Sequence, residues 1–379
     1  MATLKNIHIR NYKAFSTEQQ IEIRPVTVLI GKNSSGKSSI LKLFPLFANA
    51  TAGKTDSPLM LVNDGVSLGA RYEELFHNYT LVDLSLGASF ENGISFDVTY
   101  AIDQGNLFVY KYQVSKGKEL FGEQILSKDT PSPSGMTFPK AYEHLGIQKA
   151  DMTFKVDYIG PIRKTAPKEI VFEGFSNASK VGIDGSFAYS VLLNSHLKDD
   201  VLFKNVSQWF EDNLEGQKLL FMQNGPSTGS YSLYVKHNEV NVNISQVGQG
   251  LGQLLPIVVA SYMKNDIEVL AIEQPALHLH PAAHANVAYR IAESAKKMKR
   301  KYVIESHSEN FILGLRNMVA DPNKDFNSED VIIYFIDANE EESTLDRIEI
   351  LPNGELTSWP TGIFSESFDL MSEIMEHSK

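Results

Sequence analysis

The sequence predicts an α/β fold in which a mainly parallel sheet is accompanied by an antiparallel β insertion. Short apolar runs at residues 26–30 and 267–272 are typical of buried parallel strands, and helical patterns follow both of them. Residues 80–115 alternate apolar and polar side chains instead, with turn signals at residues 92–93 and 103–106. Those signals favour antiparallel hairpins. Strands, helices and antiparallel blocks in this order predict α/β with a β insertion.

The remaining elements follow from the same two periodicities. Alternation predicts a first strand at residues 3–10, and Ile21 and Ile23 suggest a short second one. Residues 127–140 contain three prolines and are expected to form a loop. Further helices are predicted over 38–48, 186–214, 251–263 and 281–300, and further strands over 230–244, 303–304, 331–336 and 348–351.

Length and composition predict a large globular protein. The 379 residues are 42% hydrophobic and 21% charged, which suits lobes that share a sizeable core. We expect a first lobe over residues 1–160, a helical arm over 161–240 and a second lobe over 241–379. Cysteine is absent, which excludes disulfides, cysteine-ligated zinc and thiol nucleophiles.

Charge and hydropathy limit the possible partners. With 35 basic and 46 acidic residues, the net charge of −11 argues against a surface that generally coats DNA, although a local basic groove stays open. The dense basic run at 296–301 is interpreted as a solvated helix end that complements the helix dipole, with nucleic-acid contact as the alternative. The apolar run at 254–260 is too short to span a bilayer, and residues 1–10 do not resemble a secretion signal, so we expect no membrane and a cytoplasmic protein.

A glycine-rich motif between the strand at 26–30 and the helix at 38–48 is the strongest functional signal. It has the spacing Gly31-x-x-x-x-Gly36-Lys37-Ser38. In this setting the backbone N–H groups and the helix N-terminus can surround a polyphosphate, Lys37 would reach the β- and γ-phosphates, and Ser38 would ligate Mg²⁺. A plain glycine turn is the alternative. The predicted nucleotide-contacting residues are Gly31, Asn33, Ser34, Ser35, Gly36, Lys37, Ser38 and Ser39.

Two further strands end in chemically active residues. The strand at 267–272 leads into Glu273, which we predict as a second Mg²⁺ group with Ser38, since the alternative of a surface glutamate is weaker beside the glycine motif. His307 follows the short strand at 303–304 and is a candidate γ-phosphate sensor, with a structural histidine as the alternative. A glycine-rich turn at 245–253 precedes an apolar helix. It either caps that helix or presents the helix N-terminus to an anion held by another subunit.

Taken in order, these segments resemble the heads of ABC-type ATPases, in particular the SMC, RecF and OLD-nuclease relatives. The resemblance continues outside the motifs already described. It extends to Ile7-His-Ile-Arg-Asn-Tyr-Lys-Ala-Phe15, Tyr158-Ile-Gly-Pro-Ile-Arg163, Glu273-Gln-Pro-Ala-Leu-His-Leu-His280-Pro281, the segment 305–308 and Leu356-Thr-Ser-Trp359-Pro360-Thr-Gly362-Ile-Phe364. The last of these and 158–163 are similar to small stand-alone bacterial members.

The resemblance implies an ABC-type P-loop ATPase head with a mixed-sheet core, an antiparallel β-subdomain and a helical subdomain. Two heads would pair head-to-tail, as a homodimer or within a higher oligomer. Each ATP would then lie between the glycine motif of one head and Gly248, Gln249 and Gly250 of the other. By position, Lys37, Glu273, Gln274 and His307 would be the catalytic group, with Glu273 on the Mg²⁺ side, Gln274 in the place of the catalytic glutamate and His307 as the switch histidine.

The chain also departs from the family pattern. Gln274 cannot act as a general base, and losing such a base typically slows a reaction by about 10²- to 10⁴-fold. Ala276 replaces the usual acidic residue, Gln249-Gly250 stands where a Ser-Gly pair is common, and no Q-loop glutamine is evident. No acidic cluster with the spacing of a Toprim nuclease follows residue 310. We therefore expect a head without its own nuclease.

Three functions remain open at this point. The first is a slow ATPase or ATP-gated scaffold that controls a separately encoded, nuclease-like effector, most plausibly in antiviral defence. The second is a RecF-like repair ATPase that binds DNA directly, which the net charge disfavours. The third is a nucleotide-binding assembly protein without turnover. A transporter subunit and a metal site at His278 and His280 are weaker hypotheses.

Overall fold

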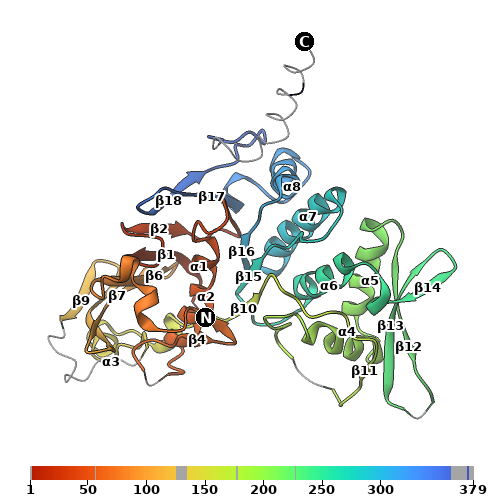
Figure 1. The fold of residues 1–379 in the computed structure, drawn as a ribbon, viewed down its shortest axis with the longest axis horizontal. Coiled ribbons are helices and arrows are strands. Elements are labelled where there is room, and N and C mark those ends of the chain that lie inside the picture. The colour runs from red at the N-terminus through yellow and green to blue at the C-terminus, as the bar shows by residue number, and fades with distance from the viewer. Residues whose placement is uncertain are drawn as a thin grey trace.

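A six-stranded mixed sheet forms the centre of the molecule. The computed structural model describes residues 2–55, 57–124, 135–175, 178–226, 228–359 and 374. The strand order is β10-β15-β16-β3-β17-β18, in which the first five strands are parallel and the last is antiparallel to its neighbour (Figure 1). The strands are β10 (Val156–Ile159), β15 (Val269–Glu273), β16 (Lys301–Glu305), β3 (Val26–Gly31), β17 (Val331–Ala338) and β18 (Ser343–Ile348).

The register of this sheet brings three chain segments to one edge. Glu273 pairs with Glu305 across β15 and β16, and Gly31 is the last residue of β3, opposite Ile336. Because parallel strands end at the same edge of a sheet, the glycine motif and both glutamates meet there. The predicted α/β class with strands at 26–30 and 267–272 is confirmed.

Helices cover both faces of the central sheet, and alternate strand residues divide between two hydrophobic cores. Ala271 and Val303 belong to the core that includes the helices after β3, whereas Ile272 and Ile304 belong to the other core. Such alternation is the expected result of the period of two in a strand. The helices are α1 (Lys37–Leu41) and α2 (Leu43–Thr51) on the first face, and α6 (Gln249–Tyr262), α7 (Pro281–Met298) and α8 (Glu309–Ala320) on the second.

The helix predicted over 38–48 is divided into α1 and α2 at Lys42. Pro45 lies in the first turn of α2 and has no N–H group to bond to Leu41, four residues earlier. The interruption therefore follows from the sequence, although the apolar periodicity hides it. Neither β10 nor α8 is among the predicted elements.

An antiparallel sheet forms the lobe beside the N-terminus, as the hairpin signals predict. Its order is β2-β1-β6-β7-β8-β9, and the first strand of the chain joins it rather than the central sheet. The short helix α3 (Pro139–Leu145) packs on its last two strands. Residues 127–134 of the predicted loop lie outside the described residues, and its last two residues, Pro139 and Lys140, begin α3 instead. The strands are β1 (Leu4–Arg10), β2 (Gln19–Glu22), β6 (Leu84–Phe90), β7 (Ile94–Asp103), β8 (Asn106–Lys116) and β9 (Glu119–Gln124).

The arm on the opposite side contains both helices and strands (Figure 1). Its two helices, α4 (Phe187–Leu197) and α5 (Val201–Asn213), fall within the range predicted to be helical. Beside them lies an antiparallel sheet with the order β11-β13-β12, in which β14 also pairs with β13; β11 precedes the two helices in the chain and the other strands follow them. The strands are β11 (Ile170–Val171), β12 (Lys218–Gln223), β13 (Ser230–His237) and β14 (Val240–Asn243). The division of the chain at residues 160 and 240 stays a prediction.

The interpretation of the basic run at 296–301 as a solvated helix end is wrong for three of its cations. Lys296 Nζ lies 2.9 Å from Asp330 Oδ1, and Lys301 Nζ donates to the backbone oxygens of Leu4 and Ile23. Arg300 is buried and donates to carbonyls at the end of α6. These cations connect elements of the fold, which leaves little of the run for a nucleic acid. In the part of the chain that the structure describes, no helix combines the length and apolarity needed to cross a membrane.

Candidate functional site

The glycine motif forms a loop from β3 into α1, as its spacing predicts, and we call residues 31–38 the phosphate-binding loop. Gly31 has a φ of +147°, and a Cβ added there would lie 2.4 Å from the carbonyl oxygen of Ile336 on the neighbouring strand. Only glycine suits this conformation and this approach. The loop thereby turns away from the sheet edge. Consecutive N–H groups in such a turn can face an anion, although that of Ser35 donates to the Lys32 carbonyl at 3.4 Å.

Lys37 is buried at the start of α1 and is bonded within the loop. Its Nζ donates to the backbone oxygen of Gly31 at 3.0 Å and lies 3.4 Å from Ser35 Oγ. Burial lowers the pKa of Lys37, and the nearby charge of Glu305 opposes that effect. The ammonium group therefore already has partners at the centre of the loop, where a phosphate would exchange with them.

A cavity of about 310 Å³ lies over this loop, and it includes residues that the motif analysis did not identify. Lys13 and Ala14 line it, from the turn after β1, where the Tyr12 hydroxyl donates to the backbone oxygen of Ser39 and the ring of Phe15 packs against Gly36. The segment 7–15 carried only a family resemblance in the sequence. The cavity lining consists of Lys13, Ala14, Asn33, Ser34, Ser35, Gly36, Lys37, Ser38, Ser39 and Glu305.

Two buried carboxylates lie at the edge of the sheet beside the loop. Glu273 and Glu305 are each 6% exposed and are neighbours in the register of β15 and β16. Burial raises the pKa of Glu273, and the Tyr158 hydroxyl donates a hydrogen bond to its Oε1. Ser38 Oγ donates to Glu305 Oε2 at 2.7 Å. The sequence analysis did not select Glu305, although it ends a buried strand next to the loop, as Glu273 does.

The Ser38 hydroxyl and the carboxylates of Glu273 and Glu305 are hard oxygen groups of the kind that Mg²⁺ prefers. Phosphate oxygens supplied by a nucleotide would add to them. The hydrogen bond from Ser38 to Glu305 shows that these side chains already reach one another. The residues present therefore fit a magnesium ion, with Glu305 as an addition to the predicted pair.

Gln274 and His307 extend from the same edge. The backbone N–H of Gln274 donates to the Glu305 carbonyl at 2.8 Å, and its φ of +49° is left-handed. Among the described residues, no hydrogen bond to the Gln274 side chain is found. His307 is exposed, but its partial burial lowers its pKa, and the positive charge of Lys37 lowers the pKa further. The two groups therefore lie close enough to interact. The predicted residues of the loop, both strand ends and the histidine segment are thus brought together.

Gly248, Gln249 and Gly250 are not part of this assembly. They lie at the start of α6, and Gly248 and Gly250 line a separate cavity of about 390 Å³ with His278, Leu279 and His280. A Cβ on Gly250 would lie 2.5 Å from the carbonyl oxygen of His278, so this close approach requires glycine. Gly248 and Gln249 are exposed. In one chain, the two glycine-rich segments line different cavities.

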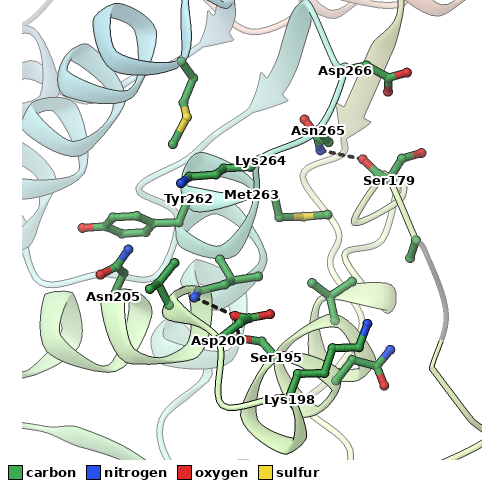
Figure 2. Close-up of a pocket in the computed structure, with 16 residues that line it drawn as sticks. Ser179, Ser195, Lys198, Asp200, Asn205, Tyr262, Met263, Lys264, Asn265 and Asp266 are labelled. Atoms are coloured by element: carbon green, nitrogen blue, oxygen red, sulfur yellow. Dashed lines mark hydrogen bonds between the residues drawn. The ribbon is translucent and has the colours of Figure 1, made fainter.

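A third cavity, of about 600 Å³, lies at the opposite end of β15 from Glu273. Figure 2 shows it between the end of α4 and the turn to α5, with Ser195, Lys198 and Asp200, and the end of α6 with the following segment 263–266. None of the predicted site residues lines it. The predicted chemistry therefore belongs to the other edge of the sheet.

The parallel sheet edge, the phosphate-binding loop and the two strand-end carboxylates together define an ABC-type P-loop ATPase head, as the sequence predicts. Comparison with known families agrees with this class. A family model described as "AAA ATPase domain" matches residues 3–181 and 191–312. The chain belongs to this family. A second model, described as a protein of unknown function, matches residues 326–374.

Individual relatives are more distant. The DNA replication and repair protein RecF of Rippkaea orientalis (strain PCC 8801 / RF-1) is 32% identical over 87 residues, which cover 22% of this chain and 22% of RecF. A crystal structure titled as the SmcHead bound to the C-winged helix domain of ScpA has 12% identity and a TM-score of 0.48, with 92% of this chain and 98% of that chain covered. An SMC head domain from Thermotoga maritima has 10% identity and a TM-score of 0.41, with 92% of this chain and all of that chain covered. The match to RecF spans about a fifth of the length of that relative.

Proposed function

We propose that this protein is a slow ATPase whose ATP-bound state is completed by a second copy of the chain. One observation carries the proposal. The phosphate-binding loop and the exposed start of α6, two segments suited to phosphate, line different cavities of a single chain. A head-to-tail pair would place the start of α6 from one copy over the loop of the other.

In this proposal the loop of one chain binds the triphosphate. The backbone N–H groups of residues 31–38 face the phosphates, and Lys37 exchanges its carbonyl partners for phosphate oxygens. Ser38, Glu273 and Glu305 would hold a magnesium ion, which supplies charge neutralisation on the phosphates when it is bound. Lys13 and Ala14 contact the nucleotide from the turn after β1.

Slow turnover is proposed from the chemistry of Gln274. An amide cannot accept the proton of an attacking water, but it can orient the water through hydrogen bonds, as a glutamine does in small GTPases. His307 would contact the γ-phosphate from the end of β16. Before a nucleotide binds, partial burial and the charge of Lys37 lower the pKa of its imidazole. The result would be a long-lived ATP-bound state.

The start of α6 would supply the second half of the site. Its first turn holds no acidic residue, and its N-cap residue Gly248 makes no side-chain capping bond. The first N–H groups of such a helix lack intrahelical partners, and they favour an anion. Gln249, exposed beside them, would add an amide donor.

We further propose that the long-lived assembly controls a separately encoded, nuclease-like effector in antiviral defence. Slow hydrolysis suits a switch or scaffold better than a motor, and Gln274 supports slow hydrolysis because its amide cannot act as a general base. Phage plating on cells that carry the gene with its genomic neighbours tests the proposal. Protection that survives Lys37→Ala would contradict it.

The ATPase part of the proposal is tested by phosphate release from the purified protein with ATP and Mg²⁺. Lys37→Ala is expected to lower the rate on the order of 10²-fold or more, because a buried charged donor to the phosphates is removed. Lys32→Ala removes an exposed lysine of the same loop and should have little effect. Equal rates for wild type and Lys37→Ala would refute the ATPase assignment, whereas ATP-dependent assembly without phosphate release would favour a non-hydrolysing assembly protein.

A second candidate is a RecF-like ATPase that binds DNA directly, supported by the match to RecF over 87 residues. The expected signature is DNA-stimulated hydrolysis that weakens steeply with salt. The net charge of −11 and the internal bonds of the basic run argue against it. Hydrolysis that does not respond to duplex or single-stranded DNA at low salt would exclude this candidate.

A further inference from the structure

Arg163 lies at the junction of β10, α6 and the end of β15. It follows β10 in the segment 158–163 and is 3% exposed. The side-chain amide of Gln253, on α6, makes two hydrogen bonds with the backbone of Arg163. Gln253 Nε2 donates to the Arg163 carbonyl at 2.9 Å, and the Arg163 N–H donates to Gln253 Oε1 at 3.3 Å. The position of Arg163 therefore depends on α6.

The guanidinium group of Arg163 extends from this clamp to the backbone beside the candidate site. Nη2 donates to the carbonyl of Gln274 at 3.1 Å and to the carbonyl of Glu273, while Nη1 donates to the carbonyl of Gln253 at 3.3 Å. Burial lowers the pKa of Arg163 to about 10, so the group stays charged at neutral pH. One planar cation thus connects α6 with the two residues that end β15.

The backbone of Gln274 needs such support. Its left-handed φ of +49° is uncommon for a residue other than glycine. Its N–H is bonded to the Glu305 carbonyl, and its carbonyl accepts from Arg163 and from the N–H of Leu277. Without Arg163, the Glu273 carbonyl would lose a buried donor and one of the bonds that hold the Gln274 peptide would be missing.

We propose that Arg163 is a positioning residue that couples the start of α6 to Gln274. The inference rests on the proposed ATPase function. Gln253 lies four residues after Gln249, about one helical turn along α6, so engagement of the helix start by a nucleotide on a second copy moves or fixes Gln253. Arg163 transmits that state to the peptide of Gln274, and hence to the amide that orients water.

Arg163→Lys is the informative variant, because it keeps the charge but removes the planar fork that reaches several carbonyls at once. The chain offers a matched control in Arg300, which is also 3% exposed and donates to the carbonyls of Ala260 and Met263 at the other end of α6. Arg300→Lys perturbs the same helix by the same chemistry, but at the opposite end of α6.

Kinetics provide the first measurement. Arg163→Lys is expected to lower kcat on the order of 10- to 100-fold, since small displacements of a catalytic group have effects of this size. The affinity for a fluorescent ATP analogue should stay within about 3-fold of wild type, because the loss is confined to the reacting state. Arg300→Lys should keep kcat near the wild-type value. A similar loss in both variants, or a loss of ATP affinity with kcat unchanged, would overturn the proposal.

Coupling to α6 is tested with Gln253→Ala and the double variant. If Gln253 acts through Arg163, the double variant should be no slower than Arg163→Lys alone, since residues in one network are not additive. Fully additive losses would show that the two side chains act separately and would overturn the coupling.

Amide hydrogen exchange supplies a readout that does not need turnover. In the nucleotide-free protein, Arg163→Lys should accelerate exchange in peptides that cover residues 273–280, whereas Arg300→Lys should leave them unchanged. Wild-type protein without ATPase activity would refute the proposed function, and the exchange pattern would still decide the role of Arg163. Unchanged exchange in Arg163→Lys would overturn that role even in an active enzyme.

Discussion

The starts of helices α1 and α6 both follow glycine-rich segments, but their surroundings differ. The loop before α1, with the residues around it, is enclosed, and we call it the α1 side or enclosed side of the site. Lys37 is bonded to loop oxygens, Ser38 to Glu305, and Phe15 packs against Gly36. The segment before α6 is open, with exposed Gly248 and no side-chain cap, and we call it the α6 side or open side. Each helix nevertheless starts with N–H groups that lack intrahelical acceptors.

This difference indicates which part of a nucleotide site one chain can complete alone. The α1 side has the cation, the hydroxyl and the carboxylates in place, with Lys37 bonded to a loop carbonyl and Ser38 to Glu305. The α6 side presents a rigid start, because residues 254–260 of the same helix are buried in the second core. A rigid open helix start is a suitable surface for an anion held elsewhere.

The largest expected effect tests whether a general base for ATP hydrolysis is the only catalytic group that the α1 side lacks. Gln274→Glu should raise the rate of ATP hydrolysis by about 10²- to 10⁴-fold, because a carboxylate can accept the proton of the attacking water. Steady-state phosphate release measures it. Combining the change with Lys37→Ala should abolish the gain. A rate that stays at the wild-type level would show that residue 274 does not lie at the attacking water.

The next effect tests whether Glu305 belongs to the enclosed side. Glu305→Gln should raise the Mg²⁺ concentration needed for half-maximal ATP binding by roughly 10- to 100-fold, because a carboxylate near Ser38 is lost. Titration of nucleotide binding with Mg²⁺ or Mn²⁺ measures this directly. Glu309→Gln, an exposed position at the start of α8, is the control. Identical metal dependence in both variants would remove Glu305 from the metal site.

A smaller effect is expected on the open side. Gln249→Glu should weaken ATP-dependent dimerisation by about 10-fold, because a like charge then faces the phosphates across the interface. Nucleotide binding to the separate chain should be unaffected. Light scattering with and without ATP measures assembly, and Gln246→Glu, also exposed, controls for the added charge. Loss of monomer binding instead of dimerisation would contradict the division into two sides.

Local patterns predict much of the fold and of the enclosed side. Glycine spacing predicted the loop at 31–38, and apolar runs predicted the strands that end near Gly31 and Glu273. The loop and each strand lie within one short stretch of sequence, so they can be predicted without knowing which distant segments pair.

Other features depend on pairing between distant segments. Glu305 joins the site through the register of β15 with β16, and Arg163 through bonds to Gln253 and Gln274, more than 80 residues away. Periodicity carries no register between parallel strands, so it does not show that Glu305 lies beside Glu273 or that Arg163 reaches Gln274. The prediction for the basic run failed for the same reason, since Lys301 bonds to β1 and to residue 23.

The smallest effect concerns charges within the enclosed side. Partial burial and the charge of Lys37 lower the pKa of His307 below its ordinary value of about 6.5, so the folded chain binds fewer protons than the unfolded chain as pH falls toward and below 6.5. This group therefore makes stability fall as pH falls through that window. Lys37→Gln should raise the pKa of His307 and reduce the effect of pH on stability.

Hydrogen exchange at the imidazole carbon, followed by mass spectrometry across pH, measures the pKa of His307, with exposed His237 as an internal control. An unchanged His307 pKa in Lys37→Gln would mean that the lysine does not act on the histidine before a nucleotide binds, and that the two groups do not form one electrostatic site in the single chain.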